Sequence, residues 1–542
     1  MRLGLAQLNP ILGDIEGNTT KILEAVQEAK EKGCQLVLVP ELALTGYPPE
    51  DLIFKSAFIK DNLSALKKLA SSIRDTALLV GFIDEKKGKC YNAAAYIHKG
   101  RIHTIHHKNC LPNYGVFDEA RYFAPGINPS HQIVNKERVG ITICEDLWWG
   151  PNHLRKLKNK KPHFVVNLSA SPYHMRKFQI RFDAIKKSAE HLKSPIIYCN
   201  MVGGQDELVY DGGSFVVLPN GKLAARFPQF QNGLFVFDLI REKKQWKLKT
   251  DHPFSKDLPE EEEILQALIL GTRDYVNKNG FEKVTLGLSG GIDSALVATI
   301  AVKALGSERV VGVTMPSRFN QPETREDAKR LADNLGIALH EIPIEDIFLG
   351  YQKSLAPIFE DTTPNVAEEN VQARIRGNLL MALSNKFGWL VLTTGNKSET
   401  STGYCTLYGD MAGGFSVLKD VLKKTVYRLA NHINSQTEKE IIPHSIIARP
   451  PTAELRSDQR DEDTLGSYEN LDPLISKYVE KNWSIKKMIK NTQVDEAYAK
   501  RIVNLIDQNE YKRRQAPPGI KITSRAFGRD HRMPITNRYK MQ

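Results

Sequence analysis

The sequence has no hydrophobic run long enough to cross a membrane and no pattern of paired cysteines. No apolar stretch of the 542 residues approaches the roughly 20 residues that a bilayer-spanning helix needs. The six cysteines are scattered without a CxxC spacing, so neither a disulfide framework nor a zinc site is indicated. The chain also begins directly in strand-like sequence, without a charged leader or a cleavage site. We therefore expect a cytoplasmic protein that is neither secreted nor membrane-bound.

The sequence also lacks a nucleic-acid-binding pattern, although it is basic. The formal net charge of +12 would suit a polyanionic partner. The basic runs 155–161 and 512–514 are short, however, and carry no interleaved aromatic residues that could stack on bases. We expect no nucleic-acid partner, because small anionic substrates such as nucleotides explain the same charge, and a solvated surface explains the runs.

The chain length and a change of rhythm along the chain predict two large domains. A chain of 542 residues is too long for one hydrophobic core. Residues 1–240 contain many short β-rich runs and fewer helical patterns, which favours mixed sheets covered by helices, an α/β sandwich. Residues 241–262 are charged and irregular, as in a linker. From 263 to 542 strands alternate with helices, the pattern of a doubly wound parallel sheet.

Turn residues predict two hairpins in the first domain. They lie at Lys99-Gly100 and at Asn220-Gly221, and the second pair is typical of a type I′ turn. The polar, basic end of the chain, 524–542, contains Phe527, Met533 and Ile535, so we expect part of it to dock on the second domain.

Three reactive side chains of the first domain each follow a β-rich run: Glu41, Lys108 and Cys144. Strand ends at one edge of a sheet can converge in space. A cysteine attacks a carboxamide as its thiolate, a carboxylate can carry the thiol proton to the departing ammonia, and an ammonium stabilises thiolate and oxyanion. The three residues are therefore a complete set for amide hydrolysis. Cys144 taken alone is better explained as a packed structural cysteine, because free cysteine is among the most buried residue types.

The sequences around these residues resemble the nitrilase, or carbon–nitrogen hydrolase, superfamily and in particular its glutaminase domains. The matching strings are PELALTGYP around Glu41, HKNCLPNYGVFDEARYF from His107, and GITICEDLWW around Cys144. The resemblance covers most of residues 1–240 and implies an α-β-β-α sandwich. It implies that Glu41 is the general base, Lys108 the oxyanion stabiliser and Cys144 the nucleophile that forms a thioester, with Glu119 as a further acidic residue near the lysine.

The same resemblance implies that glutamine is bound by Tyr114, Ser171 and Lys177, the last two within NLSASPYHMRK. Without the resemblance these residues are a packed tyrosine, a turn serine and a surface lysine.

In the second domain the run VTLGLSGGIDS, residues 284–294, combines a strand, a glycine-rich turn and a helix start. Glycines let the backbone approach a phosphate closely, and successive N–H groups with a helix N-terminus bind anions. The lysine of a Walker A loop is missing. The run resembles the pyrophosphate loop of the N-type ATP pyrophosphatases, which have an adenine nucleotide α-hydrolase-like fold, attach AMP to a carbonyl oxygen and release pyrophosphate. The resemblance implies ATP contacts from Gly287, Leu288, Ser289, Gly290, Gly291, Ile292, Asp293 and Ser294, with Mg²⁺ at Asp293.

Three further strings resemble the NAD⁺ synthetases, in their long, glutamine-dependent form. They are ENVQARIRGNLLM (369–381), LTTGNKSE (392–399) and YGDMAGGFSVLKDVLKKTVY (408–427). The resemblance implies further ATP contacts from Thr394, Lys423 and Thr452, a second Mg²⁺ ligand in Glu399, and contacts to deamido-NAD from Asn370, Arg374, Glu399 and Lys512. Each isolated basic residue also has a solvated surface position as its alternative. The stretch 408–427 differs from the short ammonia-dependent synthetases, and His531-Arg532 stands where those have a His-Lys pair.

Together the resemblances imply ATP-dependent amidation of deamido-NAD to NAD⁺, with ammonia taken from glutamine and an adenylated intermediate. They also imply a homo-oligomer with an internal ammonia passage. Two alternatives stay open: a glutamine-fed ATP pyrophosphatase with another acceptor, and a non-catalytic interaction protein that retains the motifs. The intact reactive residues argue against the second alternative.

Overall fold

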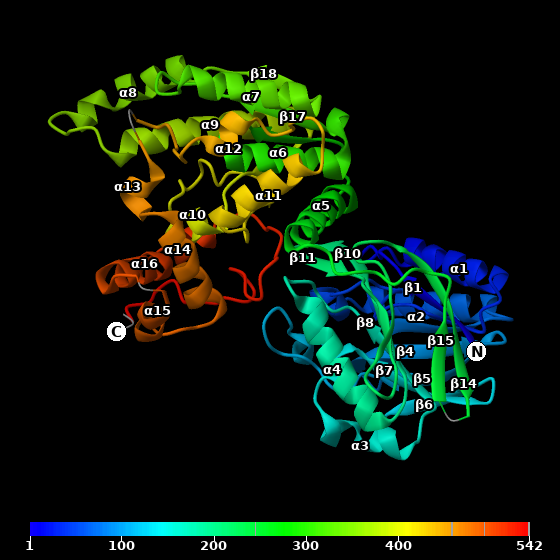
Figure 1. Ribbon diagram of the computed structural model, residues 1–542. Coiled ribbons are helices and arrows are strands. Elements are labelled where there is room, and N and C mark those ends of the chain that lie inside the picture. Colours follow the sequence, from blue (N-terminus) through cyan, green and yellow to red (C-terminus); the bar gives the residue numbers. More distant parts are fainter. Residues whose placement is uncertain (244, 457–458, 493, 540–542) are drawn as a thin grey trace. The chain divides into compact units, whose positions relative to one another are not determined.

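The computed structural model of the chain describes residues 1–243, 245–456, 459–492 and 494–539 (Figure 1). The chain divides into two compact units, Met1–Gln205 with Val209–Leu258, and Asp206–Leu208 with Pro259–Gln542. Within the described residues no helix is both long and apolar enough to cross a membrane. Each unit has its own sheets and core.

The first unit contains two large mixed sheets and one two-stranded sheet, β10-β11. The larger sheet has the order β15-β14-β1-β2-β3-β4-β5, with parallel pairing from β1 to β3 and antiparallel pairing elsewhere. The six-stranded sheet has the order β13-β12-β9-β8-β7-β6, with parallel pairing from β7 to β9. The strands are β1 (Arg2–Gln7), β2 (Leu36–Leu38), β3 (Ala77–Lys86), β4 (Lys89–His98), β5 (Arg101–His107), β6 (Ser130–Val134), β7 (Glu137–Ile143), β8 (Phe164–Ser169), β9 (Ile196–Asn200), β10 (Val202–Gln205), β11 (Leu208–Asp211), β12 (Phe215–Val217), β13 (Leu223–Arg226), β14 (Gly233–Glu242) and β15 (Gln245–Lys249).

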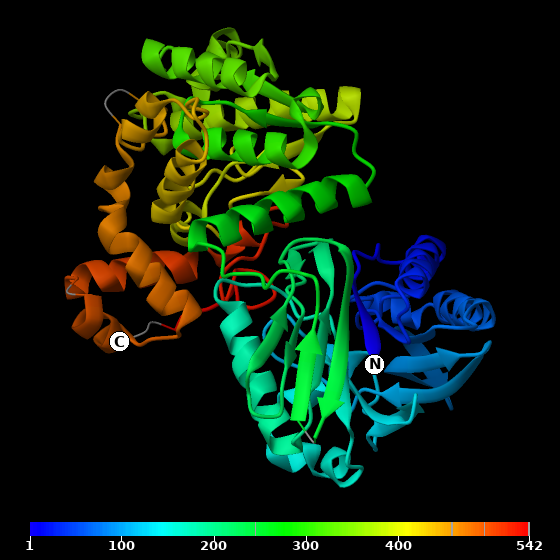
Figure 2. The ribbon, with the colours of Figure 1, turned by 45° about the vertical axis from the view of Figure 1, so that its right-hand side comes forward.

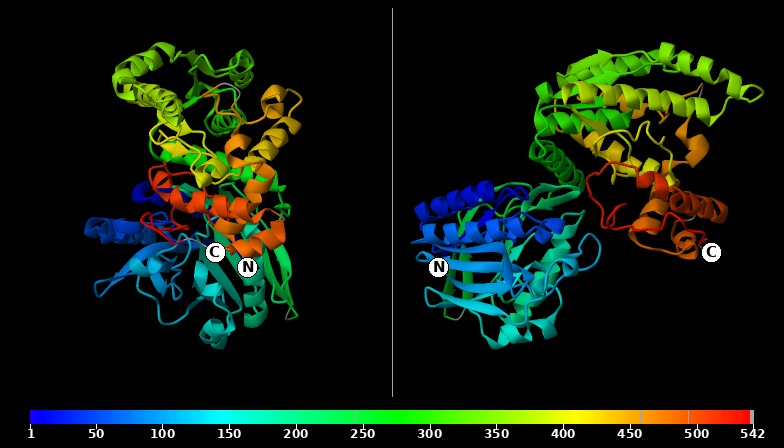
Figure 3. Two further views of the ribbon diagram at one scale, coloured as in Figure 1. Left: turned by 90° about the vertical axis from the view of Figure 1, so that its left-hand side faces the viewer. Right: turned by 180° about the vertical axis from the view of Figure 1, so that it is seen from behind.

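The two large sheets pack face to face between helices, which confirms the predicted α-β-β-α sandwich. In β2, Leu36 and Leu38 belong to the core between the sheets, whereas Val37, and Val39 just after the strand, pack under the outer helices. A central strand buried on both faces reads as a continuous apolar run for this reason. Helices α1 and α2 lie side by side on the larger sheet, and α3 and α4 cover the other (Figure 3). The helices are α1 (Ile15–Glu31), η1 (Glu50–Phe54), α2 (Ser56–Ser72), η2 (Glu119–Arg121), η3 (Cys144–Leu147), α3 (Pro151–Asn159) and α4 (Lys177–Leu192).

Both predicted hairpins are present, but one turn type was wrong. Lys99 and Gly100 join β4 to β5 with φ values of 51° and 78°. In the β12–β13 hairpin the Gly221 N–H donates to the Leu218 carbonyl at 2.9 Å. The central residues of that turn are therefore Pro219 and Asn220 rather than Asn220 and Gly221. The proline ring accounts for the difference, because it holds φ near −65° and suits the second position of an ordinary β-turn.

Part of the segment expected to be an irregular linker, 241–262, has regular structure. β14 continues to Glu242, β15 pairs with it, and α5 begins at Glu260. Charged residues of β15 alternate with Trp246 and Leu248, which pack against the core between the sheets. The alternation of polar and apolar residues covers only five residues and lies among other charged residues, so the sequence did not reveal the strand. The three-part division of the chain stays a prediction.

The second unit is built on five parallel strands in the order β18-β17-β16-β19-β20, which confirms the predicted doubly wound sheet. The chain first moves outward from β16 to β18 and then returns to the other side of β16 with β19. Such a reversal of strand order opens a crevice at the carboxyl ends of the strands. The strands are β16 (Val284–Gly287), β17 (Val310–Thr314), β18 (Ala338–Glu341), β19 (Leu390–Thr393) and β20 (Phe415–Ser416).

The helices around this sheet form two layers and a separate helical group. Helix α6 packs with α5, α7 and α11. Helix α9 packs on β16 and β19, and α8 packs on α9. Helices α14 to α16 share a core of their own, shown in orange in Figure 2. The helices are α5 (Glu260–Lys278), α6 (Ile292–Leu305), η4 (Ser307–Arg309), α7 (Pro322–Leu335), α8 (Glu345–Phe359), α9 (Val366–Phe387), α10 (Lys397–Thr402), α11 (Lys423–Ser435), α12 (His444–Ala448), α13 (Asp461–Leu465), α14 (Tyr468–Ile475), the π-helical turn η5 (Ser476–Glu480), α15 (Ile485–Thr492), α16 (Glu496–Gln508) and α17 (Glu510–Arg513).

The C-terminal segment docks on this helical group through one of the three expected apolar residues. Phe527 is buried in the core of the group, whereas Ile535 is 52% exposed. The ring of His531 lies edge-on to Phe527, 5.2 Å between centroids, and is itself buried. Burial, together with the charges of Arg525 and Arg513, lowers the pKa of His531 to about 4.

We predict that His531 makes the docked segment acid-sensitive. His531 takes up a proton near pH 6.5 in the unfolded chain and only near pH 4 in the folded chain. The resulting loss of folding stability is absent above pH 6.5 and complete below pH 4. A shift of this size corresponds to about 3 kcal/mol. The free energy of unfolding of the wild type should therefore fall relative to that of His531→Gln as the pH drops from 6.5 to 4. Denaturant titrations across this range measure the difference, and a constant difference would contradict the prediction.

Candidate functional site

In the first unit Glu41, Lys108 and Cys144 converge, although they come from both large sheets. Glu41 lies just beyond β2, Lys108 directly follows β5, and Cys144 directly follows β7. The Lys108 Nζ atom lies 2.7 Å from Glu41 Oε1 and 2.8 Å from Glu119 Oε1, and all four side chains are buried. Tyr47 donates a further hydrogen bond to Glu119 at 2.8 Å. The sequence-predicted residues thus form one water-excluded cluster.

The charges of this cluster act on the thiol of Cys144. Burial and the carboxylate of Glu41 raise the pKa of Cys144 well above its usual value, and Lys108 only partly opposes them. Burial alone would lower the pKa of Lys108, but Glu119 and Glu41 raise it. Burial also raises the pKa of Glu119. The thiol is therefore protonated at rest at neutral pH and needs a base to become a nucleophile.

Two groups that the sequence did not suggest hold Glu41 in place. Asn92 Nδ2 donates to Glu41 Oε1 at 2.7 Å, and the Ala170 N–H donates to Glu41 Oε2 at 2.8 Å. With Lys108, they fix both oxygens of the carboxylate. An asparagine inside an apolar strand, in NAAAY after Tyr91, is the one signal in the sequence that could have indicated this role.

The turn that carries Cys144 is held by Asp146, which was also missed. Cys144 has a φ of 38°, and η3 starts with it. The Asp146 carboxylate accepts hydrogen bonds from the backbone N–H groups of Ile143 (3.0 Å), Asn109 (2.8 Å) and Cys110 (3.0 Å), and from His106 Nε2 (3.0 Å). The same side chain therefore fastens the Cys144 turn to the segment that follows Lys108.

The expected glutamine-binding residues surround this turn. The Tyr114 hydroxyl donates to Glu145 Oε1 at 2.9 Å, and Lys177 Nζ lies 4.9 Å from the centroid of the Trp148 ring. Ser171 is buried next to Ala170, and its Oγ accepts a hydrogen bond from Arg181 Nε at 3.1 Å. Tyr114 is 55% exposed and Lys177 is partly exposed, so these two side chains remain accessible to a small molecule.

A buried ion pair holds the backbone at Ser171. Arg181, in α4, pairs with Asp211 at 2.7 Å, and neither side chain is exposed. Arg181 Nη2 also donates to the Ser171 carbonyl at 2.7 Å. The backbone around Ser171 is thereby fixed by a group that does not enter the site.

In the second unit the glycine-rich loop after β16 lines a cavity of about 290 Å³. Gly290 has a φ of 77°, and a Cβ atom there would lie 2.1 Å from the Thr324 carbonyl oxygen. Only glycine fits this position. Every residue expected to contact ATP lines the cavity: Gly287, Leu288, Ser289, Gly290, Gly291, Ile292, Asp293, Ser294, Thr394, Lys423 and Thr452.

Asp293 and Glu399 share one lysine at the floor of this cavity. Lys423 Nζ contacts Asp293 Oδ2 and lies 3.3 Å from Glu399 Oε1. Asn396 Nδ2 donates to Asp293 Oδ1 at 2.9 Å. Burial raises the pKa of Glu399. Two carboxylates that reach one cation present the oxygen ligands that Mg²⁺ prefers, so these residues fit the expected metal.

The other residues expected to bind deamido-NAD lie around the loop 403–407. Asn370, Arg374 and Lys512 all contact this loop and do not line the cavity, whereas Glu399 does. Positions 370 and 374 are one turn apart on α9 and so face the loop together. The bonds are Thr406 Oγ1 to Asn370 Oδ1 (2.7 Å), Arg374 Nε to Leu407 O (3.2 Å), and Lys512 Nζ to Gly403 O (2.7 Å) and Cys405 O (2.9 Å).

Arg376 and Asp461 line the cavity and were not suggested by the sequence. Arg376 donates to the Met315 carbonyl at 3.0 Å, and it forms no ion pair within the described part of the chain. Burial lowers the pKa of Arg376 to about 10. Asp461 Oδ1 is buried without a hydrogen-bond partner, and burial raises the pKa of Asp461. A half-buried cation and a buried carboxylate that line the same cavity are suited to a charged ligand.

The folds and sites define a carbon–nitrogen hydrolase unit joined to a nucleotide-binding α/β unit. The carbon–nitrogen hydrolase family matches residues 2–245, and the NAD synthase family matches residues 264–516. The glutamine-dependent NAD⁺ synthetases of Thermotoga maritima and Aquifex aeolicus are 48% and 46% identical to the chain, over 99% or more of each sequence. The solved structure of the Acinetobacter baumannii enzyme in complex with ADP is 41% identical, covers 99% of this chain and 98% of its own, and has a TM-score of 0.80. The chain belongs to the glutamine-dependent NAD⁺ synthetase family.

We predict that Asp146→Asn loosens the Cys144 turn. One oxygen becomes an NH₂ group that faces backbone N–H donors, so at least one of them loses its acceptor. Burying such an unsatisfied group costs about 1–3 kcal/mol. The free energy of unfolding should fall by this amount, and alkylation of Cys144 by a glutamine-analogue electrophile should slow. Asp183→Asn, at an exposed position of α4, is the matched control; an equal effect of both changes would refute the role of Asp146.

Proposed function

We propose that the chain synthesises NAD⁺ by ATP-dependent amidation of deamido-NAD, with ammonia released from glutamine. The products are NAD⁺, AMP, diphosphate and glutamate. The observation that carries the proposal is the presence, in one chain that matches the relatives over its full length, of both a Glu41–Lys108–Cys144 cluster and a carboxylate-floored cavity behind a glycine-rich loop.

In the first half-reaction Cys144 attacks the carboxamide carbon of glutamine. Glu41 accepts the thiol proton and passes it to the departing ammonia, and the Lys108 ammonium stabilises the oxyanion. Water then hydrolyses the thioester, with Glu41 again as the base. The raised pKa of Cys144 supports this order, because the proton must leave at the moment of attack. Tyr114, Ser171 and Lys177 hold the α-substituents of glutamine.

In the second half-reaction the carboxylate of deamido-NAD attacks the α-phosphorus of ATP to form an adenylate, and ammonia then displaces AMP. The loop Ser289–Gly291 and the first turn of α6 bind the phosphates. Asp293 and Glu399 would hold Mg²⁺, which would neutralise charge on the phosphates. Thr394, Lys423 and Thr452 contact ATP. Deamido-NAD is bound by Glu399 in the cavity and by Asn370, Arg374 and Lys512 around the loop 403–407.

A different glutamine-fed ATP pyrophosphatase is the rival function, and the full-length relatives speak against it. The rival predicts that AMP forms with another acceptor in place of deamido-NAD. A non-catalytic role would require the reactive residues of both centres to be idle.

We also propose that the protein is a cytoplasmic homo-oligomer. Helices α8 and α9 expose Ile358 (75%) and Val366 (62%), together with Tyr351, on the hairpin that they form. Exposed apolar side chains gathered on one element are typical of a surface that a second copy covers.

We predict that Cys144→Ala abolishes NAD⁺ synthesis from glutamine and preserves synthesis from added ammonium chloride. The nucleophile is lost, whereas the second centre is untouched. Formation of NAD⁺ from ATP, Mg²⁺ and deamido-NAD with each nitrogen source measures both activities. Cys90→Ala, at a half-buried cysteine remote from the cluster in sequence, should retain both. Loss of both activities in Cys144→Ala would refute this division of labour.

We predict that Arg376→Ala weakens ATP binding. The half-buried guanidinium lines the cavity and forms no ion pair among the described residues, so it is available to the phosphates. A charge-assisted hydrogen bond contributes roughly 1.5–3 kcal/mol, or about 10- to 100-fold in affinity. The KM for ATP should rise by that factor in the ammonia-dependent assay, and glutamine hydrolysis should be retained. Lys386→Ala, at an exposed position on the same helix, is the control. An unchanged KM for ATP would exclude contact with the phosphates.

A further inference from the structure

Lys397 is a completely buried lysine that the proposed reaction does not use. It is the first residue of α10, between Asn396 and Glu399 of the candidate ATP site. Its Nζ atom lies 2.7 Å from Asp420 Oδ1, 2.9 Å from Thr523 Oγ1 and 3.1 Å from Glu480 Oε1. Burial opposes the charge of Lys397, but Asp420 and Glu480 outweigh it and raise the pKa of the lysine. The ammonium is therefore a permanent charge inside the second unit.

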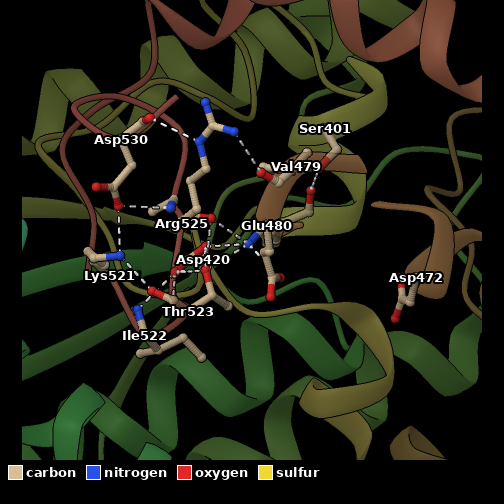
Figure 4. Close-up of polar contacts among 12 residues, drawn as sticks. Ser401, Asp420, Asp472, Val479, Glu480, Lys521, Ile522, Thr523, Arg525 and Asp530 are labelled. Carbon is tan, nitrogen blue, oxygen red and sulfur yellow. Dashed lines mark hydrogen bonds and ion pairs between the residues drawn. The ribbon is translucent and has the colours of Figure 1, made fainter. Parts of the chain in front are cut away.

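The partners of Lys397 come from three separate parts of the second unit. Figure 4 shows Asp420, Glu480 and Thr523 grouped together, from the loop before α11, from η5 and from the C-terminal segment. Asp420 Oδ2 also accepts the backbone N–H groups of Ile522 (2.8 Å) and Thr523 (2.7 Å). The orientation of Asp420 is thus set from the C-terminal side as well as by the lysine.

The segments 396–399 and 420–423 are joined on two sides. In the cavity Glu399 of the first segment pairs with Lys423 of the second at 3.3 Å. Away from the cavity the first segment supplies the cation, Lys397, and the second the anion, Asp420, at 2.7 Å. Two backbone links lie between these ion pairs, from the Lys397 N–H to the Val421 carbonyl and from the Lys423 N–H to Ser398 Oγ, both at 2.9 Å. A rotation of α10 that moves Glu399 therefore also moves Lys397 away from Asp420, unless the segment 420–423 moves with it.

A buried ion pair is an expensive way to hold two segments together. Desolvation of both charges usually cancels most of their attraction, and apolar residues of similar size often stabilise a fold equally well. A charged pair with several hydrogen bonds restricts the two segments to a single geometry. At this place that geometry includes the two site residues Glu399 and Lys423.

We propose that Lys397 is a positioning residue of the synthetase site, which through Asp420, Glu480 and Thr523 sets the places of Glu399 and Lys423 at the cavity floor. This inference rests on the proposed function. Lys397 touches neither substrate nor metal in this scheme. It acts by holding the carboxylate and the ammonium that do.

The test compares NAD⁺ formation from ammonium chloride by the full-length wild type and by Lys397→Met, with Mg²⁺ varied. We expect kcat to fall at least tenfold and the Mg²⁺ concentration for half-maximal rate to rise, while glutamine hydrolysis by the first unit stays within threefold of the wild type. The double variant Lys397→Met/Asp420→Asn keeps the formal charge of the cluster and should show the same loss. Thr523→Val, which removes one acceptor and retains all charges, serves if neither variant folds. We expect it to lower kcat at least fivefold, and a kcat within threefold of the wild type would overturn the inference.

Lys521→Met is the matched control. Lys521 is buried in the same C-terminal segment and pairs with Asp530 at 2.7 Å, and no bond from its side chain to α10 or to 420–423 occurs among the described residues. It should lower the melting temperature and leave kcat within threefold of the wild type.

Retention of kcat within threefold by the Lys397 variants, whatever their melting temperature, would show a purely structural role and overturn the inference. A loss in Lys521→Met equal to that in Lys397→Met would overturn it too, because loosening of the C-terminal segment alone would then suffice. Failure of the wild type to form NAD⁺ would instead refute the proposed function.

Discussion

A lysine shared between two carboxylates, out of contact with water, recurs at each centre of this protein. Lys108 lies between Glu41 and Glu119, Lys423 between Asp293 and Glu399, and Lys397 between Asp420 and Glu480. Two carboxylates held away from water repel each other, and a cation between them reduces that repulsion. Each lysine therefore fixes the positions of two acidic groups, and the proposed chemistry depends on those positions.

The two chemical centres use this arrangement differently. In the first unit the cluster raises the pKa of Cys144, so the thiol stays protonated until a base removes its proton. In the second unit Lys423 gathers two oxygen ligands at the floor of a cavity whose loop is open to phosphate. Burial thus favours a protonated thiol in one place and brings two carboxylates onto one lysine in the other, as the neighbouring groups dictate.

Local sequence was a good guide where function requires a continuous string. The loop 284–294 and the flanks of Cys144 were predictable because strand, turn and helix start must follow one another directly to present a backbone or a nucleophile. Site residues on helix faces were harder to predict from the sequence. Arg374 and Arg376 are two residues apart on α9, so they point in different directions, and only the packed helix reveals that Arg376 lines the cavity. Alternation in β15 was too short and too charged to stand out from a linker.

The sequence by itself determined the two layered architectures and the order of the units, and it predicted the reactive residues, because periodicity and contiguous motifs are local properties of the chain. Only the tertiary structure decided which distant groups hold those residues: Asn92 and Ala170 on Glu41, Asp146 under Cys144, and Lys397 with Asp420 behind Glu399. Along the chain these supports lie two residues away, as Asp146 does from Cys144, or as many as 129, as Ala170 does from Glu41. Their roles arise from burial and hydrogen-bond satisfaction in three dimensions, which no local pattern encodes.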